Sequence, residues 1–223
     1  RVCKDLDIDP VKDVNVDDKF IYTQLQDLRS RHGLFHIEAD TAFKVCRTVT
    51  PDSLDELSAV LAIARPGAIQ FEGLYADVAH GNAQMEAVHP FFDKILQETK
   101  GVVLDQEQLM AMANKMGFSL DDAELLRRIV GKKKVSEVRK WKKRVVSLVK
   151  KNKKLAKKHN GKDAGEVFWR ILEDSANYSF NKSHSIAYAS LSAQTVYLKF
   201  NHPQVFFLNL LKMTRHEPDP VEQ

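Results

Sequence analysis

Residues that start and stop α-helices recur along most of this 223-residue chain. Asp105 and Gln108 have the spacing of an N-cap pair, in which each side chain bonds the other residue's backbone N–H. Gly117 stands where the helix that they begin would end, since glycine takes the left-handed conformation of a helix C-terminus at little cost. Strand signals are weak, and residues 33–37 are the best candidate. The pattern predicts a mainly α fold with little strand.

The same reasoning places the other elements. Ser119 with Asp122 forms a second capping pair, and its helix closes at Gly131. Thr50 followed by Pro51 has the form of a cap and a first helical residue. We expect an extended lead-in over residues 1–18 and further helices over about 51–64, from Pro90, over about 183–201 with its break at His202-Pro203, and over about 204–213.

Positive charge is concentrated in one stretch of a chain whose net charge is only +4. Residues 132–158 hold fourteen Lys or Arg and one acid, Glu137, for a net +13, whereas the rest of the chain carries −9. Apolar residues run through the stretch at helical spacing, with Asn152 filling one position: Val135, Val138, Trp141, Val145, Leu148 and Leu155. One face can therefore pack while the others carry Lys, which indicates nucleic-acid binding; a merely solvated basic face is the alternative.

A second cluster of cations surrounds the predicted helix end at Gly131. Arg127 and Arg128 fall in the last turn, and Lys132, Lys133 and Lys134 follow. Cations at a helix C-terminus are favoured by its dipole, so simple charge matching is one interpretation. The other is a phosphate site, because five cations exceed what a helix end needs and Arg matches phosphate geometry.

The hexapeptide Phe-Asn-Lys-Ser-His-Ser over residues 180–185 opens the predicted long helix. Unpaired N–H groups at a helix N-terminus attract anions, and Lys182 and His184 can add hydrogen bonds to phosphate oxygens. Tyr188 lies four residues after His184, so the two share a helix face. This layout favours a nucleotide site; an Asn-capped helix with Lys and His facing water is the alternative.

Several motifs in order resemble the C-family bacterial replicative DNA polymerases, the DNA polymerase III alpha subunits. The longest is FNKSHSIAYASLSAQTVYLKFNHP over residues 180–203, which resembles the fingers segment of that family. The others are GLFHIEAD at 33–40, Arg-Pro-Gly at 65–67, GVVLDQEQLM at 101–110 and GFSLDDAELLRRIVGKK at 117–133. Asp105 stands where the family usually has Tyr, and Ala68 replaces a usual Pro. The resemblance implies the multi-helix fingers domain of a divergent member, viral or split.

The resemblance also implies roles for individual residues. In this family, cations of the two phosphate segments meet the incoming dNTP triphosphate, and the His/Tyr helix lies against the nascent base pair. The nucleotide-binding residues expected by this matching are Arg65, Arg127, Arg128, Lys132, Lys182, His184 and Tyr188. The basic stretch itself nominates as DNA-binding residues Lys133, Lys134, Lys142, Lys143, Lys150, Lys151, Lys153 and Lys154.

No catalytic metal centre is expected in this chain. Asp5, Asp7 and Asp9 alternate near the start, but this region resembles the polar connector that leaves the palm of the polymerase. The resemblance implies that Mg²⁺ is held by a palm on another segment or chain. Cys3 and Cys46 are too few for a zinc site or a disulfide framework, and a reducing cytoplasmic setting in a bacterial cell, phage-infected or not, is the simpler reading. No apolar run suggests a membrane span.

The expected organisation follows these motifs. We expect a connector from the palm at 1–32, a first helical fingers part at 33–131, a basic helical segment at 132–166, the hexapeptide helix region at 167–213 and a polar tail at 214–223. Two functions remain open. One is the fingers portion of a DNA-directed DNA polymerase, inactive alone, which binds dNTP and primer-template and needs a palm-bearing partner. The other is a non-enzymatic nucleic-acid-binding or adaptor protein derived from such a polymerase.

Overall fold

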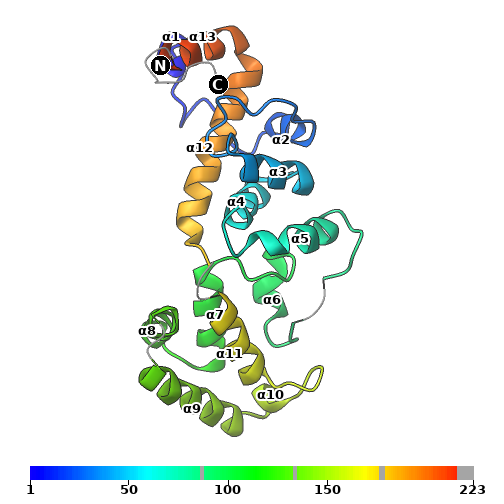
Figure 1. Ribbon diagram of the computed structural model, residues 1–223, viewed down its shortest axis with the longest axis vertical. Coiled ribbons are helices and arrows are strands. Elements are labelled where there is room, and N and C mark those ends of the chain that lie inside the picture. Colours follow the sequence, from blue (N-terminus) through cyan, green and yellow to red (C-terminus); the bar gives the residue numbers. More distant parts are fainter. Residues whose placement is uncertain (86–87, 133–134, 176–178, 215–223) are drawn as a thin grey trace. The chain divides into compact units, whose positions relative to one another are not determined.

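The computed structural model describes residues 1–85, 88–132, 135–175 and 179–214, and these residues are arranged as α-helices joined by turns (Figure 1). No strand occurs among them; isolated bridges pair Asp105 with Phe180 and His159 with Lys162. The predicted mainly α fold is confirmed. The chain divides into a terminal unit, Arg1–Ala64 with Ser183–Gln223, and a central unit, Arg65–Lys182.

The terminal unit contains the first four helices and the last two. Their bounds are α1 Val2–Asp5, α2 Lys19–Gln26, α3 Asp40–Val49, α4 Leu54–Ile63, α12 Lys182–Asn201, whose first residue belongs to the central unit, and α13 Pro203–Thr214. Small buried residues on α12, among them Ser185, Ala189 and Ala193, allow close packing. A buried hydrogen bond of 2.8 Å joins the hydroxyls of Ser58 on α4 and Ser185 on α12.

Three expectations for the terminal unit are wrong. The lead-in is not extended throughout, because α1 forms and packs against α13. Helix α4 begins after Ser53, whose hydroxyl accepts from the N–H of Glu56, while Thr50 ends α3 with a φ of 46°. Residues 33–37 form turns instead of a strand; Leu34 and Ile37 are both fully buried, which is helical spacing, and His36 has a left-handed φ of 59°.

The central unit is built from the remaining helices. They are η1 Ile69–Phe71, α5 Glu72–Ala79, α6 Asp93–Leu96, η2 Gln97–Thr99, α7 Gln106–Met116, α8 Leu120–Gly131, α9 Val135–Lys151, α10 Lys153–Ala156 and α11 Ala164–Ser175, with η marking 3-10 helices. Their shared core includes Phe92, Leu109, Met112, Leu126 and Phe168. The chain turns at Pro90, and α6 starts only at Asp93, so the helix predicted from Pro90 is wrong in its start.

The predicted caps of the central unit are confirmed. Asp105 and Gln108 form the reciprocal capping box of α7, and Gly117 ends that helix with a φ of 107°. Ser119 caps α8 by accepting from the N–H of Asp122, and α8 ends at Gly131. These bonds satisfy N–H groups that a helix start leaves unpaired, which is why short sequence signals located them.

The basic stretch forms two helices instead of one. The side chain of Asn152 accepts from the N–H of Lys154 and caps α10, so it breaks the stripe that it was expected to continue. The apolar side nevertheless packs, with Val145, Val149 and Leu155 almost completely buried. Gly165 on α11 allows this contact, because a Cβ built there would lie 2.5 Å from a methyl group of Val149. Helices α9 and α11 therefore approach closely (Figure 1).

Candidate nucleotide and nucleic-acid interface

Two arginines at the end of α8 share one carboxylate. Glu124 accepts from Nε and Nη2 of Arg127 at 2.9 and 2.8 Å, and from Nε of Arg128 at 2.6 Å. The Arg127 hydrogen bond, with that of Arg128 and both positive charges, lowers the pKa of Glu124 to about 2 although partial burial opposes the shift. The structure thus brings the two predicted phosphate ligands together on a single oxyanion. Lys132, which caps the same helix, is exposed.

The start of α12 is also held by carboxylates. Glu107 of α7 accepts from the backbone N–H of Lys182 at 2.9 Å and from the side chain of Asn181 at 3.0 Å. The ammonium of Lys182 donates to Glu98 at 2.8 Å. The hydrogen bond to Glu124 raises the pKa of Arg127 although partial burial opposes the shift, and the charges of Glu124 and then Glu107 add to the increase. In the central unit, therefore, Lys182 and the two arginines all face acidic oxygens.

The Gln106-Glu107-Gln108 motif binds the segment before α12 at several points. Gln106 donates from its side chain to the carbonyl of Ser179 at 3.1 Å, and its backbone N–H donates to the carbonyl of Phe180. Gln108 is buried and donates to the hydroxyl of Thr99 at 2.6 Å. The motif found by resemblance therefore fixes the backbone that precedes Lys182. Nothing here requires a tyrosine at position 105, where Asp105 caps α7.

Arg65 lies over the ring of Phe180, with its guanidinium carbon 4.1 Å from the ring centroid. This cation–π contact ties the Arg-Pro-Gly turn to the first residue of the hexapeptide. The side chain remains exposed. Arg65 also follows the end of α4 at Ala64, so its turn stops that helix as predicted.

An aromatic cluster surrounds Tyr188 in the terminal unit. The ring centroids of His184 and Tyr188 lie 4.0 Å apart, so the two residues share a helix face as their spacing predicted. The ring centroids of His36 and Phe35 lie 4.5 and 5.5 Å from that of the same tyrosine. Phe35 is stacked on Tyr188, and its backbone is held by Thr195 and Ser192 of α12. The cluster presents flat rings, with His36 and His184 exposed.

Partial burial of the His36 ring and the neighbouring His184 both lower the pKa of His36, and the burial contributes more. The lowered pKa favours the neutral form of the His36 ring. Neutral rings suit contact with an uncharged nucleobase better than contact with phosphate. This environment distinguishes His184 from Lys182, although both belong to the hexapeptide.

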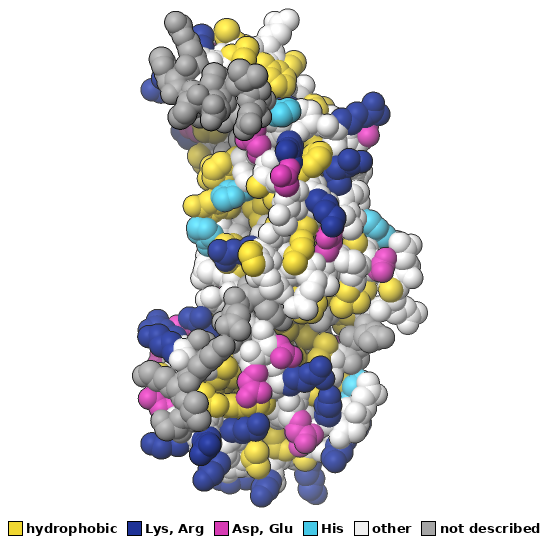
Figure 2. Space-filling view, in the orientation of Figure 1, with side chains coloured by type: hydrophobic (Ala, Val, Ile, Leu, Met, Phe, Trp, Pro, Cys, Tyr) yellow, Lys and Arg dark blue, Asp and Glu magenta, His cyan; other side chains and the backbone are white. Residues whose placement is uncertain are grey.

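The basic face of α9 is a third feature, in the central unit. An open groove of about 690 Å³ is lined by Arg139, Lys142, Lys143, Val146, Ser147 and Lys150. These residues recur at threes and fours, so they follow one side of the helix. Figure 2 shows Lys and Arg side chains gathered at the lower edge of the view, over α9. The groove contains three of the predicted DNA-binding lysines and adds Arg139.

The remaining predicted DNA-binding lysines have different positions. Lys151, Lys153 and Lys154 are exposed and lie at and beyond the end of α9, outside the groove lining. Lys133 and Lys134 fall outside the described residues. Arg144, which was not nominated, points elsewhere, since it pairs with Asp122 and lies over the rings of Trp141 and Phe118.

Comparison with known proteins decides the family. Residues 3–153 match the model of the bacterial DNA polymerase III alpha subunit finger domain, which is more than half of the chain. The chain belongs to this family. The predicted resemblance is thereby confirmed for the fingers region.

Full-length relatives agree with this assignment. The chain is 40% identical over 176 residues to the DNA polymerase III subunit alpha of Thermotoga maritima, covering 78% of this chain and 19% of that protein. It is 35% identical over 192 residues to the protein of the same name from Bacillus subtilis, with 86% and 17% covered. The corresponding protein of Halalkalibacterium halodurans is 33% identical over 192 residues, with the same coverage. This fingers domain therefore spans under a fifth of the length of these relatives.

Metal ligands are not gathered in the described part of this fingers domain. No group of three or more His, Cys, Asp or Glu side chains there is placed to hold a metal ion. Asp5 accepts from the side chain of Asn209 at 2.8 Å, and Asp9 caps its own turn by accepting from the N–H of Val11. These residues do not fit a Mg²⁺ site, so no catalytic step through Mg²⁺ is derived for this chain. The described helices also include none with the length and apolar character that crossing a bilayer requires.

Sequence reasoning missed the acidic partners of the fingers-domain cations. Glu98 and Glu107 carry no spacing signal, because their partners at the start of α12 lie more than seventy residues away. Glu124 does carry one, since Arg127 and Arg128 follow it at i+3 and i+4 on α8, but this segment was judged only for its cations. It also missed Lys199, a buried lysine whose ammonium donates to the carbonyls of Ser30 and His32 at 2.8 and 2.9 Å. Burial lowers the pKa of Lys199. One sign of this role was present in the sequence, because Lys199 is a charged residue on the side of its helix that packs.

Proposed function

We propose that this fingers domain binds the incoming dNTP and the template DNA during template-directed DNA synthesis by a polymerase whose palm lies on another segment or chain. The central unit supplies cations for the triphosphate and a basic helix for the DNA backbone. The terminal unit supplies rings for the nascent base pair. Each role is assigned within its own unit.

The observation that carries the proposal is the set of carboxylates on the predicted phosphate ligands. Glu98 accepts from the ammonium of Lys182, Glu124 accepts from Arg127 and Arg128, and Glu107 accepts from the backbone N–H of Lys182, so these oxygens take the acceptor positions that phosphate oxygens would take in the proposed complex. Guanidinium, ammonium and helix N-terminal N–H groups bind either anion with similar geometry. Two carboxylates on these cations and a third on the helix N-terminus support their assignment as an oxyanion site that a triphosphate enters by exchange.

The chemistry assigned to this chain is positioning and charge neutralisation. Phosphoryl transfer spreads negative charge over the phosphate oxygens, and cations fixed before the reaction stabilise that charge without reorganising. We assign Arg127, Arg128 and Lys182 to the phosphates, with Lys132 and Arg65 at the edge of the same set. His184 and Tyr188 are assigned to the base pair, and Phe35 and His36 extend their ring surface.

Mg²⁺ belongs, in this proposal, to the palm-bearing segment, where it would supply charge neutralisation at the reacting phosphate. The purified chain should therefore fail to extend a primer. Extension by this chain alone, abolished by Asp7→Ala with Asp9→Ala, would overturn this assignment.

The test of the proposal is single-nucleotide incorporation by a palm-bearing polymerase that contains this fingers domain. Lys182→Ala and Arg128→Ala each remove a charge-assisted hydrogen bond worth about 1.5–3 kcal/mol, so kcat/KM for dNTP should fall roughly ten- to a hundredfold. Lys94→Ala is the matched control, because this exposed lysine of α6 belongs to neither proposed site. Unchanged dNTP kinetics in both site variants would contradict the proposal.

The basic face of α9 gives an adaptor function a specific observation of its own. An adaptor derived from a polymerase would bind DNA through Lys142, Lys143 and Lys150 and would be indifferent to dNTP. In an adaptor, substitutions at these α9 lysines would weaken DNA binding, whereas Lys182→Ala would leave the dNTP kinetics of the polymerase unchanged. The same set of variants therefore separates the two functions.

A further inference from the structure

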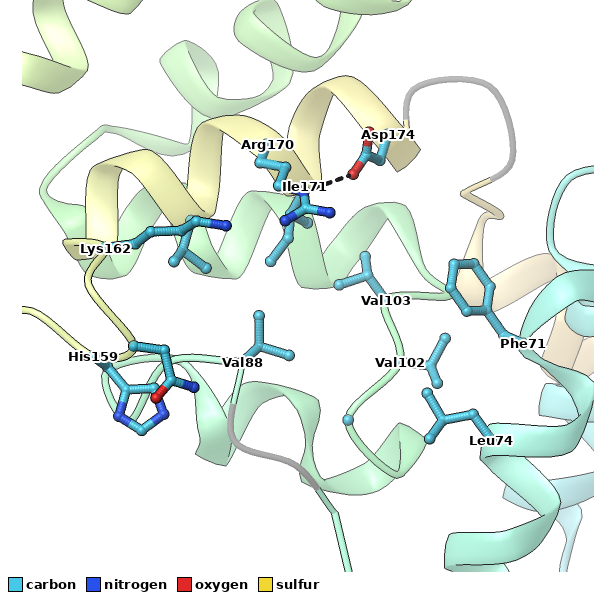
Figure 3. Close-up of a pocket in the computed structure, with 13 residues that line it drawn as sticks. Phe71, Leu74, Val88, Val102, Val103, His159, Lys162, Arg170, Ile171 and Asp174 are labelled. Carbon is cyan, nitrogen blue, oxygen red and sulfur yellow. Dashed lines mark ion pairs between the residues drawn. The ribbon is translucent and has the colours of Figure 1, made fainter.

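A cavity in the central unit has no part in the proposed nucleotide or DNA sites. It has a volume of about 410 Å³, within the range of roughly 300–1,000 Å³ that ligand pockets occupy. Its walls come from α5, the segment around residue 102, the loop at 159–162 and α11 (Figure 3). None of the predicted nucleotide- or DNA-binding residues lines it.

The interior of the cavity is apolar and its rim is partly apolar as well. Val102, Val103 and Val167 are almost completely buried at its base. Leu74 and Val88 are 47% and 36% exposed, so apolar surface continues outside the cavity. Together with the cavity, these two exposed side chains offer apolar surface that a partner could cover. A small ligand enclosed in the cavity would leave this rim uncovered.

Positive charge lies along one side of the cavity. Figure 3 shows Lys162 and Arg170 on the side of α11, with Val88 across from them. Asp174 is the single acid of the lining, and its contact with Arg170 is 3.6 Å long between two largely exposed side chains. An exposed ion pair of this kind is weak, so Asp174 competes poorly with an incoming carboxylate.

The lysine side of the cavity is held by a tight turn. The backbones of His159 and Lys162 exchange hydrogen bonds of 2.8 and 3.1 Å across Asn160 and Gly161, which both have left-handed φ angles. This is the pattern of a two-residue hairpin turn. The buried ring of His89 contacts the carbonyl of Lys157 at 3.1 Å and fixes the preceding backbone. The lysine side of the cavity is therefore fixed by hydrogen bonds within the chain itself.

We infer that this cavity is a docking site for an acidic peptide segment of a partner protein, which inserts one or two bulky apolar side chains and pairs its flanking carboxylates with Lys162 and Arg170. Charge complementarity and the apolar rim together specify this occupant. An apolar anchor in a preformed pocket with charged groups at its edge is a common mode of peptide recognition. The inference is independent of the nucleotide function.

The test uses the purified chain and a fluorescein-labelled peptide, Asp-Glu-Asp-Leu-Phe-Asp-Glu-Asp, in a fluorescence anisotropy titration. Leu74→Asp should weaken binding at least about tenfold by placing a like charge against the peptide, and Lys162→Glu with Arg170→Glu should do the same. A peptide with Ala-Ala in place of Leu-Phe should also lose about tenfold or more, since it lacks the anchor. All three substituted positions are exposed, so thermal unfolding should be unchanged.

An acidic peptide can also bind the lysines of α9, and the controls separate this outcome. Lys142→Glu with Lys143→Glu should leave anchor-dependent binding intact, and duplex DNA should not compete with the peptide. Binding that follows the α9 variants, that DNA displaces, or that ignores loss of the Leu-Phe anchor would overturn the inference. Binding of 8-anilinonaphthalene-1-sulfonate that depends on Leu74 and Arg170, with no peptide binding, would also overturn it in favour of a small amphipathic anion.

Discussion

The central unit contains two groups of cations that differ in their neighbours. Arg127, Arg128 and Lys182 each donate to a carboxylate of another residue. Lys143 and Lys150 on α9 are exposed, and in the described part of the chain no carboxylate pairs with either. Paired cations are held in fixed directions, whereas unpaired lysines on a helix remain mobile and hydrated. The difference teaches that charge count alone does not separate a site for one small anion from a surface for a polyanion.

Each arrangement suits one of the two proposed ligands. A triphosphate needs several hydrogen-bond donors at defined positions. Arg127 and Arg128 supply such donors, and Glu124 orients their guanidinium groups by accepting from both. A DNA backbone offers a row of phosphates and releases counterions from any lysine that approaches it. The pairing with Glu98 and Glu124 also discourages non-specific DNA binding at the first group, because the charge of these cations is already partly neutralised.

The largest expected effect comes from removing charge on α9. Replacing Lys142, Lys143, Lys150 and Lys151 with Gln should lower DNA affinity roughly a thousandfold at low salt, since each lost phosphate contact removes about one unit from the salt slope. Affinities measured by anisotropy between low and moderate salt give the slope directly. If the dependence of DNA affinity on salt were unchanged, the basic face of α9 would be only a solvated surface. The proposed difference between the two groups of cations would then be wrong.

Tyr188 should respond to shape and not to charge. Tyr188→Ala removes the ring on which Phe35 stacks, and loss of one stacked base contact costs about 1–3 kcal/mol. We expect the KM for dNTP to rise roughly tenfold, and mismatch discrimination to change, in single-nucleotide incorporation. Tyr188→Phe keeps the ring and should be mild. Equal losses in the two variants would assign the role to the hydroxyl and contradict a ring contact.

Glu124 should contribute stability that depends on pH. Its pKa is lowered to about 2 in the folded chain by Arg127 and Arg128, whereas an unfolded glutamate titrates near 4.3. The contribution is therefore present above about pH 4.5 and lost as the pH falls toward 2. Discounted for solvent screening, it is about 1 kcal/mol. Urea unfolding of the native chain and Glu124→Gln at pH 7 and pH 3 checks this, and a difference that stays the same at both values would refute it.

Local signals were enough for most of the helices. Capping at Asp105 and Ser119 depends on residues a few positions apart, so the sequence located α7 and α8 closely. Thr50 misled because Ser53 is also a capping residue, and the left-handed end of α3 occupies the earlier position. Residues 33–37 misled because a short apolar run is ambiguous, and here Gly33 and His36 turn the backbone.

The candidate sites were predictable only on their basic side. Lys182, Arg127 and Arg128 belong to motifs that can be recognised in order along the chain. Their partners Glu98 and Glu107 are more than seventy residues away from Lys182, and no pattern in one sequence reports such a contact. The same holds for Phe35 beside Tyr188, which the fold brings together across about 150 residues. The organisation into five segments and the nucleotide roles remain predictions.

The most direct test of the central claim uses Glu98, the exposed partner of the Lys182 ammonium. If Lys182 binds the triphosphate, Glu98→Gln removes a competitor worth about 0.2–1 kcal/mol, so the KM for dNTP should fall by up to roughly fivefold. Lys182→Ala should raise the same KM, and Lys94→Ala should leave it unchanged. Single-nucleotide incorporation by the palm-bearing polymerase measures all three variants. Opposite shifts for Glu98→Gln and Lys182→Ala are the predicted result, and a KM that rises or stays constant in Glu98→Gln would contradict the exchange of carboxylate for phosphate.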